Sequence, residues 1–390
     1  MNAYIVAGYR SAIGKAGKGG FRFTRPDDLS ARVIHHLKAS LPGFDWGRVE
    51  DLIVGNAIPE GEQGLNFARM VALLSFGKEV AGSTVNRYCA SGLDAIALAS
   101  ATIHSGMADV IVAGGAESMS LIPMGGYKIV PNYEVSIKNP DWYFSMGLTA
   151  EAVSEKYGIS REDCDVFGLE SHRRAAAAID AGRFKDEIVP VELEEVYVER
   201  DKRKTRSYTV DTDEGVRRDA NLEVMAKLKP AFKLDGVSTA GNSSQTSDGA
   251  AYVLVVSERI LKEYNLTPIA RLAGYAVTGV DPRIMGIGPV EAVPKALKGA
   301  GLKLADMNTI ELNEAFAAQS LAVMRELDMD PEKVNPNGGA IALGHPLGCT
   351  GAVLTLKALS ELRRTNQKYG LVTACVGGGQ GIAGVFERLN

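Results

Sequence analysis

A cysteine in a turn of small residues is the first candidate for chemistry in this sequence. Cys89 lies in the segment Asn86-Arg-Tyr-Cys-Ala-Ser-Gly92, where a strand-like run gives way to a helical pattern. The positive end of a helix dipole lowers the pKa of a thiol and favours the nucleophilic thiolate, and the small neighbours Ala90 and Gly92 let a substrate approach closely. A buried structural cysteine fits the same position, because that is the most common role of a free cysteine.

A histidine in an irregular loop is harder to explain by packing alone. His345 stands between a glycine and a proline in residues 337–351, which follow neither a helical nor a strand period. Loops on a rigid scaffold commonly present catalytic bases. The other histidines lie in helical patterns with polar or alanine neighbours, so we expect structural or solvent-facing roles for His35, His36, His104 and His172.

Two further residues with chemical potential follow predicted strands. Cys375 comes at the end of the apolar run 371–376, directly before three glycines. The ends of strands are where α/β folds place their sites, although a core thiol is the alternative. Asn313 follows the run 309–312, where its side chain can hold a water or an oxyanion, cap a helix, or do both.

The glycines after Cys375 also match a dinucleotide-binding pattern. Gly379-Gln-Gly-Ile-Ala-Gly384 has the spacing G-x-G-x-x-G after a strand. That fingerprint also needs a helix, a second strand and an acidic residue about 20 positions further on. The sequence ends at Asn390, so we expect no dinucleotide site here.

The elements that position these residues follow from an alternation of short apolar runs with helical patterns. The strand-like runs are residues 1–8, 49–54, 108–113, 251–256, 269–273, 309–312 and 371–376. Between two of them, Leu93, Ile96, Ala97 and Ala101 form one face of a helix. This alternation predicts a layered α/β architecture with a mostly parallel sheet. Both ends of the chain contain a cysteine that opens a helix, followed by a strand ending in glycines, which suggests an internal duplication.

A more charged and aromatic region separates the two ends. We interpret residues 117–240 as an insertion laid over the α/β core, within which the charge run 199–206 is typical of a solvated hairpin. Ser160-Arg-Glu-Asp163 forms a capping box that predicts the start of a helix. We therefore expect an N-terminal half of residues 1–268, which includes the insertion, and a C-terminal half of residues 269–390.

The composition excludes several classes of protein. The chain has 390 residues and a net charge of −4, so nucleic acids and anionic membranes are poor candidate partners. Its four cysteines include no CxxC pair, which argues against a disulfide scaffold and a zinc ribbon, and we expect no metal site. Because no signal peptide and no run of 18 apolar residues is visible, we expect a cytoplasmic protein without membrane insertion.

Five motifs taken together resemble the thiolase family, and the resemblance covers the whole chain. They are Asn-Arg-Tyr-Cys-Ala-Ser-Gly at 86–92, Ala-Gly-Asn-Ser-Ser at 240–244, Asn-Glu-Ala-Phe-Ala at 313–317, Asn-Gly-Gly-Ala-Ile-Ala-Leu-Gly-His-Pro at 337–346 and Cys-Val-Gly-Gly-Gly at 375–379. The resemblance implies two duplicated α/β halves that form a layered α/β/α core with an inserted loop domain. It also implies an enzyme that cleaves a 3-ketoacyl-CoA with CoA, giving acetyl-CoA and a shortened acyl-CoA, or that runs the reverse condensation.

The same resemblance implies a role for each motif residue. Cys89 would carry the acyl group as a thioester, His345 would take its proton, and Cys375 would act as acid and base at the acetyl-CoA carbanion. A water held by Asn313 would form one oxyanion hole with His345, and the backbone N–H groups of Cys89 and Gly377 would form a second.

The resemblance also assigns positions to the two ends of the substrate. Arg217 matches a position near the CoA nucleotide, although beside Arg218 it can equally belong to a surface pair, and Ser244 matches one near the pantetheine arm. Met285 and Phe316 match the acyl pocket. CoA is a substrate in this family, so we expect no resident cofactor, and the resemblance implies a homodimer or homotetramer.

One position favours a degradative enzyme over a biosynthetic one. Short-chain acetoacetyl-CoA thiolases tend to carry His-Met-Gly before Thr-Ala-Glu, whereas this chain reads Ser145-Met-Gly-Leu-Thr-Ala-Glu151. Together with Gly-His-Pro-Leu-Gly-Cys-Thr-Gly at 344–351, this favours a broad-chain-length thiolase of fatty-acid β-oxidation. The alternatives are an acetoacetyl-CoA thiolase that condenses two acetyl-CoA, a decarboxylating ketosynthase, and a non-catalytic acyl-CoA-binding scaffold.

Overall fold

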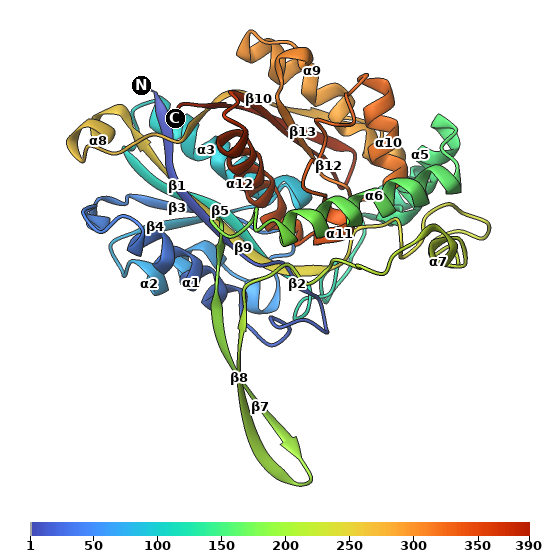
Figure 1. Ribbon diagram of the computed structural model, residues 1–390, viewed down its shortest axis with the longest axis horizontal. Helices are drawn as coiled ribbons and strands as arrows, with labels where there is room; N and C mark the ends of the chain where they lie inside the picture. Colours follow the sequence, from blue (N-terminus) through green and yellow to red (C-terminus); the bar gives the residue numbers. More distant parts are fainter. Residues whose placement is uncertain (1) are drawn as a thin grey trace.

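The computed structural model describes residues 2–390 and organises them around a long mixed sheet (Figure 1). The sheet has two halves that meet at a single residue pairing, Ile5 with Ala270. From one outer edge to the other, its strands are β4 (Ala81–Val85), β3 (Asp51–Gly55), β5 (Val110–Ser118), β9 (Ser247–Ser257), β1 (Ala3–Ser11), β10 (Ala270–Gly279), β13 (Gln380–Arg388), β12 (Tyr369–Val376) and β11 (Thr309–Leu312). Two short strands, β2 (Gly14–Lys15) and β6 (Ile188–Val189), pair with β9 and β1.

The two halves of the sheet repeat one topology. In the first half β3 is parallel to β5, while β5 and β9, and β9 and β1, are antiparallel. In the second half β11, β12, β13 and β10 are related in the same way. The repeat agrees with the duplication expected from the two ends of the sequence.

The expectation of a mostly parallel sheet is wrong. Strands β9 and β13 run antiparallel to both of their neighbours in the middle of each half. A tight turn of glycines joins β12 directly to β13, and a connection that short can join only antiparallel strands. Apolar runs alone do not reveal the length of the connections that set strand direction.

Helices fill the space between the half-sheets and cover their outer faces. α3 (Ser91–His104) and α12 (Leu347–Thr365) lie in the central layer, where they pack on each other and on strands of the sheet. α1 (Pro26–Ala39) and α2 (Phe67–Ser75) cover the first half, and α9 (Gly288–Ala300) covers the second. The layered α/β architecture is therefore confirmed.

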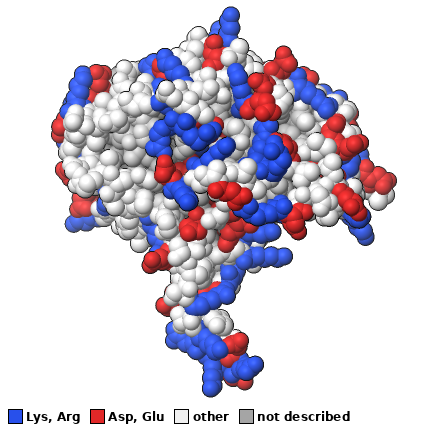
Figure 2. All heavy atoms as spheres, viewed as in Figure 1, with Lys and Arg blue, Asp and Glu red and all other residues white. Residues whose placement is uncertain are grey.

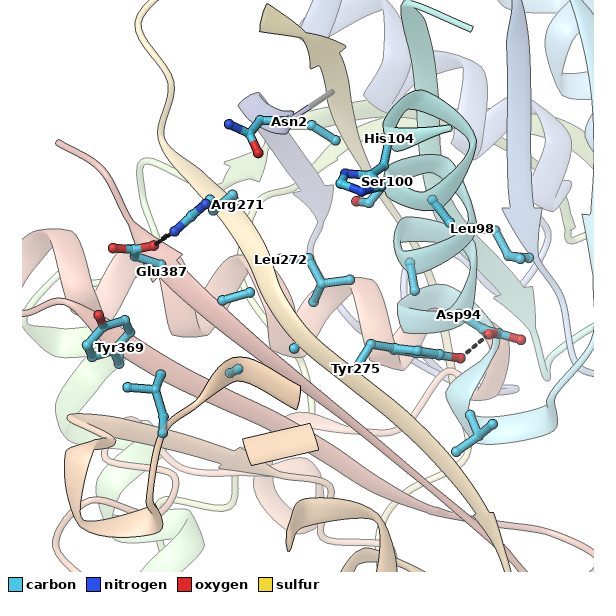
Figure 3. Close-up of a pocket in the computed structure, with 18 of the residues that line it drawn as sticks. Asn2, Asp94, Leu98, Ser100, His104, Arg271, Leu272, Tyr275, Tyr369 and Glu387 are labelled. Carbon is cyan, nitrogen blue, oxygen red and sulfur yellow. Dashed lines mark hydrogen bonds and ion pairs between the residues drawn. The ribbon is translucent and has the colours of Figure 1, made fainter. Parts of the chain in front are cut away.

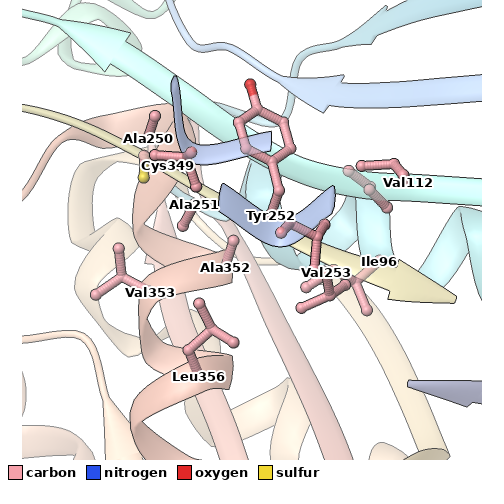
Figure 4. Packing of buried hydrophobic residues seen from close by; sticks show 14 of the residues in the cluster. Ile96, Val112, Ala250, Ala251, Tyr252, Val253, Cys349, Ala352, Val353 and Leu356 are labelled. Carbon is pink, nitrogen blue, oxygen red and sulfur yellow. The ribbon is translucent and has the colours of Figure 1, made fainter. Parts of the chain in front are cut away.

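The largest core cluster lies where the central helices meet the sheet (Figure 4). Ile96 of α3 and Leu356 of α12 pack there with Val253 of β9. At Gly92 an added Cβ would lie 2.8 Å from the backbone nitrogen of Ala352, so only glycine allows the two helices to approach this closely. Because apolar contacts hold both helices, the turns that precede them are fixed in position.

Between β5 and β9 the chain forms helices and a long hairpin. The capping box is confirmed, since Ser160 and Asp163 close it at the start of α6 (Arg161–Asp180). β7 (Val191–Glu199) and β8 (Lys202–Val210) form a ribbon that projects from the body (Figure 1) and carries charges of both signs (Figure 2). Residues 199–206 are exposed at its end, which confirms the expected solvated hairpin.

The remaining elements are short or peripheral. The helices are α4 (Tyr133–Lys138), α5 (Met146–Tyr157), α7 (Leu222–Ala226), α8 (Glu258–Glu263), α10 (Ala317–Glu326) and α11 (Ala340–Leu343). The 3-10 turns are η1 (Trp46–Arg48), η2 (Gly61–Gln63), η3 (Tyr88–Ala90), η4 (Pro140–Tyr143), η5 (Pro282–Ile287) and η6 (Leu304–Asp306). No helix among residues 2–390 is both long and apolar enough to cross a membrane.

Candidate active site

Cys89 lies in the tight turn η3, between β4 and the start of α3. The preceding Tyr88 has a positive φ of 43°, a backbone conformation that residues other than glycine rarely adopt. Ser91 holds the turn, because its hydroxyl accepts from the backbone N–H of Arg87 at 2.8 Å and donates to the carbonyl of Tyr88 at 2.7 Å. The backbone N–H groups of Cys89 and Gly377 act on the Cys89 sulfur in the direction that lowers the pKa of the thiol.

The prediction that the helix N-terminus lowers the pKa of Cys89 is wrong. Burial raises the pKa of this thiol to about 12, and the negative charge of Glu117 acts in the same direction. The two backbone N–H donors oppose this shift but do not overcome it. Loss of water around the thiolate therefore outweighs these hydrogen bonds, and the thiol stays protonated near neutral pH until a base removes its proton.

His345 lies in the turn that precedes α12, directly after Gly344. Gly344 has a φ of +114°, and an added Cβ would lie 2.4 Å from the Ser247 hydroxyl. The backbone N–H of His345 donates to Gln245 O and to Ser247 Oγ, both at 3.1 Å. Burial lowers the pKa of the imidazole to about 4, so the ring is neutral at neutral pH and can accept a proton.

Both ring nitrogens of His345 have polar neighbours. Nδ1 lies 2.6 Å from Thr350 Oγ1, and Nε2 lies 3.3 Å from Asn313 Nδ2. Asn313 comes directly after β11, and its backbone N–H donates to Thr373 O at 2.9 Å. Its Oδ1 is buried and has no hydrogen-bond partner among the described residues, so it can accept from a water or a substrate group. Asn313 does not cap a helix, since α10 begins only at Ala317, after an N-cap at Phe316.

Cys375 is buried near the end of β12, two residues before Gly377. Burial and the nearby Cys89 together raise the pKa of its thiol well above the ordinary value. The structure thus places the two thiols near each other. Cys375 packs in an apolar cluster, which we call the acyl wall, with Met146, Ala150, Met285, Ala315 and Phe316. The two residues expected in an acyl pocket, Met285 and Phe316, are both in this wall.

The glycines after Cys375 form the turn of a hairpin. Val376 pairs with Gln380 across it, and Gly378 and Gly379 both have positive φ. The pattern G-x-G-x-x-G begins in this turn and continues along strand β13, where a dinucleotide fingerprint would need a helix. A Cβ at Gly377 would contact the ring of Tyr88 and the sulfur of Met146, which places this turn against η3.

A separate cavity of about 300 Å³ adjoins the histidine. Its walls include Arg217 and Ser244, the two residues expected to contact CoA, together with the cations of Lys15 and Lys18. Gln245 also lines it, and the carbonyl of Gln245 accepts from the backbone N–H of His345. Arg217 faces this cavity rather than forming a surface pair, whereas the neighbouring Arg218 binds Asp180 on the surface.

A larger cavity, of about 720 Å³, lies elsewhere, between α3 and β10 (Figure 3). Tyr275 donates to Asp94 at one end of it, and Arg271 pairs with Glu387 at the other. None of the predicted site residues lines this cavity.

The structure adds residues to the site that the sequence did not single out. Glu117, near the end of β5, is buried, and its carboxylate accepts from the backbone N–H groups of Ala57 and Gly348, both at 2.8 Å. It thereby ties the first turn of α12 to the loop after β3. Met146 and Thr350 lie within the sequence segments 145–151 and 344–351 described above. Their nearness in sequence to Ser145 and His345 could have identified them as candidate site residues. Nothing in the sequence distinguishes Glu117 from a surface carboxylate.

Comparisons with known proteins find relatives that match almost the whole chain. Residues 3–259 match the family model "Thiolase, N-terminal domain", and residues 266–388 match "Thiolase, C-terminal domain". The chain is 51% identical to a 3-ketoacyl-CoA thiolase of Bacillus subtilis, with 99% of each chain covered. It is 46% identical to the human peroxisomal 3-ketoacyl-CoA thiolase, covering 98% of this chain and 90% of the relative. The crystal structure of the Bacillus anthracis acetyl-CoA acetyltransferase superimposes with a TM-score of 0.87 at 41% identity, covering 100% of this chain and 99% of the other.

Proposed function

The chain belongs to the thiolase family and is an acyltransferase enzyme, and on this premise we propose that it is a degradative 3-ketoacyl-CoA thiolase of fatty-acid β-oxidation. It cleaves a 3-ketoacyl-CoA with CoA and needs no resident cofactor. The observation that carries the proposal is the acyl wall around Cys375. Methionine side chains are flexible and polarisable, so Met146 and Met285 offer a surface that adapts to acyl chains of different length.

The first step is the attack of Cys89 on the keto carbon. His345 Nε2 takes the thiol proton, and the sulfur forms a bond to the carbonyl carbon, whose oxygen becomes an alkoxide. The backbone N–H groups of Cys89 and Gly377, which both act on this sulfur, then donate to that oxygen. Because burial keeps Cys89 protonated, this transfer to His345 is what makes the thiol nucleophilic.

The second step breaks the carbon–carbon bond and protonates the leaving group. The alkoxide collapses to a thioester on Cys89, and the electron pair of the broken bond moves onto the acetyl-CoA thioester oxygen as an enolate. The protonated His345 and a water held by Asn313 Oδ1 donate to that oxygen. Cys375 gives its proton to the enolate carbon, which releases acetyl-CoA and leaves a thiolate on Cys375.

The third step transfers the acyl group to CoA. The Cys375 thiolate takes the proton of the incoming CoA thiol, whose sulfur attacks the thioester on Cys89. The shortened acyl-CoA leaves, and Cys89 recovers its proton from His345. The cavity beside His345 supports CoA binding, because Lys15, Lys18 and Arg217 can neutralise phosphates while Ser244 hydrogen-bonds the pantetheine arm.

A turnover series with 3-ketoacyl-CoAs of increasing chain length tests the degradative assignment. We expect comparable kcat/KM across short, medium and long chains. Met285→Phe, which fills the acyl wall, should reduce kcat/KM for long chains more than for the four-carbon substrate, and Met285→Leu conserves volume and serves as the control. Activity confined to the four-carbon substrate would instead identify an acetoacetyl-CoA thiolase.

We also propose that the enzyme is a homo-oligomer built on a dimer. The edge strand β4 pairs only with β3 among the described residues, and unpaired edges are templates for strand pairing between chains. Beside it, α2 exposes Met70, Leu73 and Leu74. Sedimentation velocity should show a dimer or tetramer that Leu73→Glu weakens, and a wild-type monomer would contradict the proposal.

A further inference from the structure

Thr350 contacts the catalytic histidine but has no part in the steps above. It lies in the first turn of α12 and is buried, with its Oγ1 2.6 Å from His345 Nδ1. The same hydroxyl lies 3.1 Å from the carbonyl oxygen of Pro346, to which it can donate. This is the only side chain hydrogen-bonded to Nδ1 in the described part of the chain.

The hydrogen-bond inventory of these groups selects one tautomer of the ring. A threonine hydroxyl has one proton, and when it donates to Pro346 O it can only accept from His345, so Nδ1 must carry the proton. On the other side of the ring, the Asn313 amide nitrogen is a donor only, so Nε2 must accept. Both contacts favour the Nδ1–H tautomer, in which Nε2 is unprotonated.

We propose that Thr350 is a positioning residue, which fixes His345 as the Nδ1–H tautomer so that Nε2 can take the proton of Cys89. The inference rests on the proposed role of His345 as the base. The opposite tautomer carries a proton on Nε2 and cannot accept another there. After proton transfer the imidazolium keeps its Nδ1–H bond to Thr350, while the new Nε2–H can donate to the thioester oxygen.

A neutral hydroxyl suits the reversibility of this proton transfer. In a serine-protease triad a buried carboxylate fills the position behind the histidine and stabilises the imidazolium. Here burial alone accounts for the low pKa of His345, and the polar side chains on its ring are Thr350 and Asn313, neither of which is charged. Thr350 therefore orients the ring without trapping the proton that His345 must return to Cys89.

Paired substitutions test this role. Thr350→Val keeps the shape and removes the hydroxyl, whereas Thr350→Ser keeps the hydroxyl. Loss of the group that orients a metal-ligating histidine typically costs about 10–100-fold, and we take the same range for this catalytic histidine. We expect Thr350→Val to lower kcat by that factor with KM for CoA unchanged, and to slow alkylation of Cys89 by iodoacetamide near neutral pH by a similar factor. Thr350→Ser should restore both. Wild-type kcat and alkylation in Thr350→Val, or an equal loss in Thr350→Ser, would overturn the proposal.

A measurement on the wild-type enzyme decides the matter even if Thr350→Val does not fold. Nitrogen NMR of protein labelled with ¹⁵N-histidine should show His345 protonated at Nδ1 and unprotonated at Nε2, with its signals assigned by their loss in His345→Gln. The reverse pattern would overturn the proposal. Turnover of His345→Gln distinguishes the proposed role of His345 as the base from the proposed role of Thr350. Retained activity would refute the base role itself. If the variant is inactive, the NMR spectrum and the Thr350 variants decide whether Thr350 fixes the tautomer.

Discussion

The two halves of the molecule place one proposed catalytic residue each at equivalent points of the repeat. Cys89 lies two residues before α3 and His345 lies two residues before α12, and these are the central helices that precede β5 and β12. The turns differ in how they are held. Strained backbone and two backbone N–H donors surround Cys89, whereas side-chain groups of Asn313 and Thr350 surround the ring of His345.

This difference shows how the duplicated scaffold and the chemistry divide their roles. The repeated topology brings the turns at the starts of two helices into the central layer, but it does not determine which residues occupy these turns. Cys349, inside the first turn of α12, shows the contrast, because it is fully buried in the apolar core. A cysteine near the start of a central helix can therefore serve packing alone, and of these two cysteines we propose a catalytic role only for Cys89.

The largest expected effect distinguishes these two cysteines. Cys89→Ala removes the nucleophile and should lower kcat by roughly 10⁴–10⁶-fold, in the range seen when a catalytic nucleophile is removed. Steady-state thiolysis measures the loss. Cys349→Ala is the matched control in the other half and should retain turnover within about tenfold, since it only removes a sulfur from the core at a cost of about 1 kcal/mol. Equal losses of turnover in the two variants would contradict the assignment of a catalytic role to Cys89 and a packing role to Cys349.

Cys375 provides a further test of the comparison between the two turns. It is a second thiol near Cys89, but it belongs to neither turn. Cys375→Ala should reduce turnover by about 10²–10⁴-fold, the usual contribution of a general acid or base. Alkylation of Cys89 by iodoacetamide should continue at close to the wild-type rate, because His345 still takes its proton. Loss of Cys89 alkylation in Cys375→Ala would show that the second thiol activates the first.

The two turns should also limit stability at opposite ends of the pH range. The pKa of His345 falls from 6.5 to about 4 on folding, so the unfolded state binds more protons between these values. Its contribution is fully present above pH 6.5 and is lost as the pH falls to 4, by about 3 kcal/mol. The pKa of Cys89 rises from 9.0 to about 12, so its contribution is lost as the pH rises through that range. Denaturant titrations of wild type, His345→Gln and Cys89→Ala at several pH values measure each contribution to the free energy of unfolding. If His345→Gln lost stability between pH 6.5 and 4 as steeply as the wild type, the contribution assigned to His345 would be contradicted.

The smallest expected effects concern the backbone of the two turns. Gly344→Ala introduces a Cβ at a φ of +114°, against Ser247, and should destabilise the protein by about 1–3 kcal/mol while displacing His345. Tyr88→Gly relieves the strain at a φ of 43° and should change stability by less than about 1 kcal/mol. Thermal denaturation checks both, and a larger loss for Tyr88→Gly than for Gly344→Ala would reverse the comparison.

Much of the fold could be predicted from the sequence, because its strands and helices have strong local signals. The apolar run 309–312 is reproduced as β11, and the capping box at Ser160 opens α6 as expected. The mixed direction of the sheet could not be predicted, since it depends on connections such as the glycine turn after Val376. The same turn explains why a dinucleotide pattern occurs without a dinucleotide fold.

The sequence suggested candidate residues for the site but not their electrostatics. Cys89, His345 and Asn313 stand out by their neighbours in sequence, and the structure brings their elements together. The direction of the pKa shift at Cys89 was not predictable, because it depends on how completely the fold removes water from the thiol. Glu117 was also invisible, since its partners come from segments distant in sequence.

The most direct test of the account is the covalent intermediate itself. The protein would be incubated with a 3-ketoacyl-CoA, quenched in acid and digested, and the peptides that contain each cysteine would be weighed by mass spectrometry. The account predicts an acyl mass on Cys89, absent in Cys89→Ala and removed by added CoA in the wild type. An acyl group on Cys349 or Cys375, or turnover with no acyl group on Cys89, would contradict it.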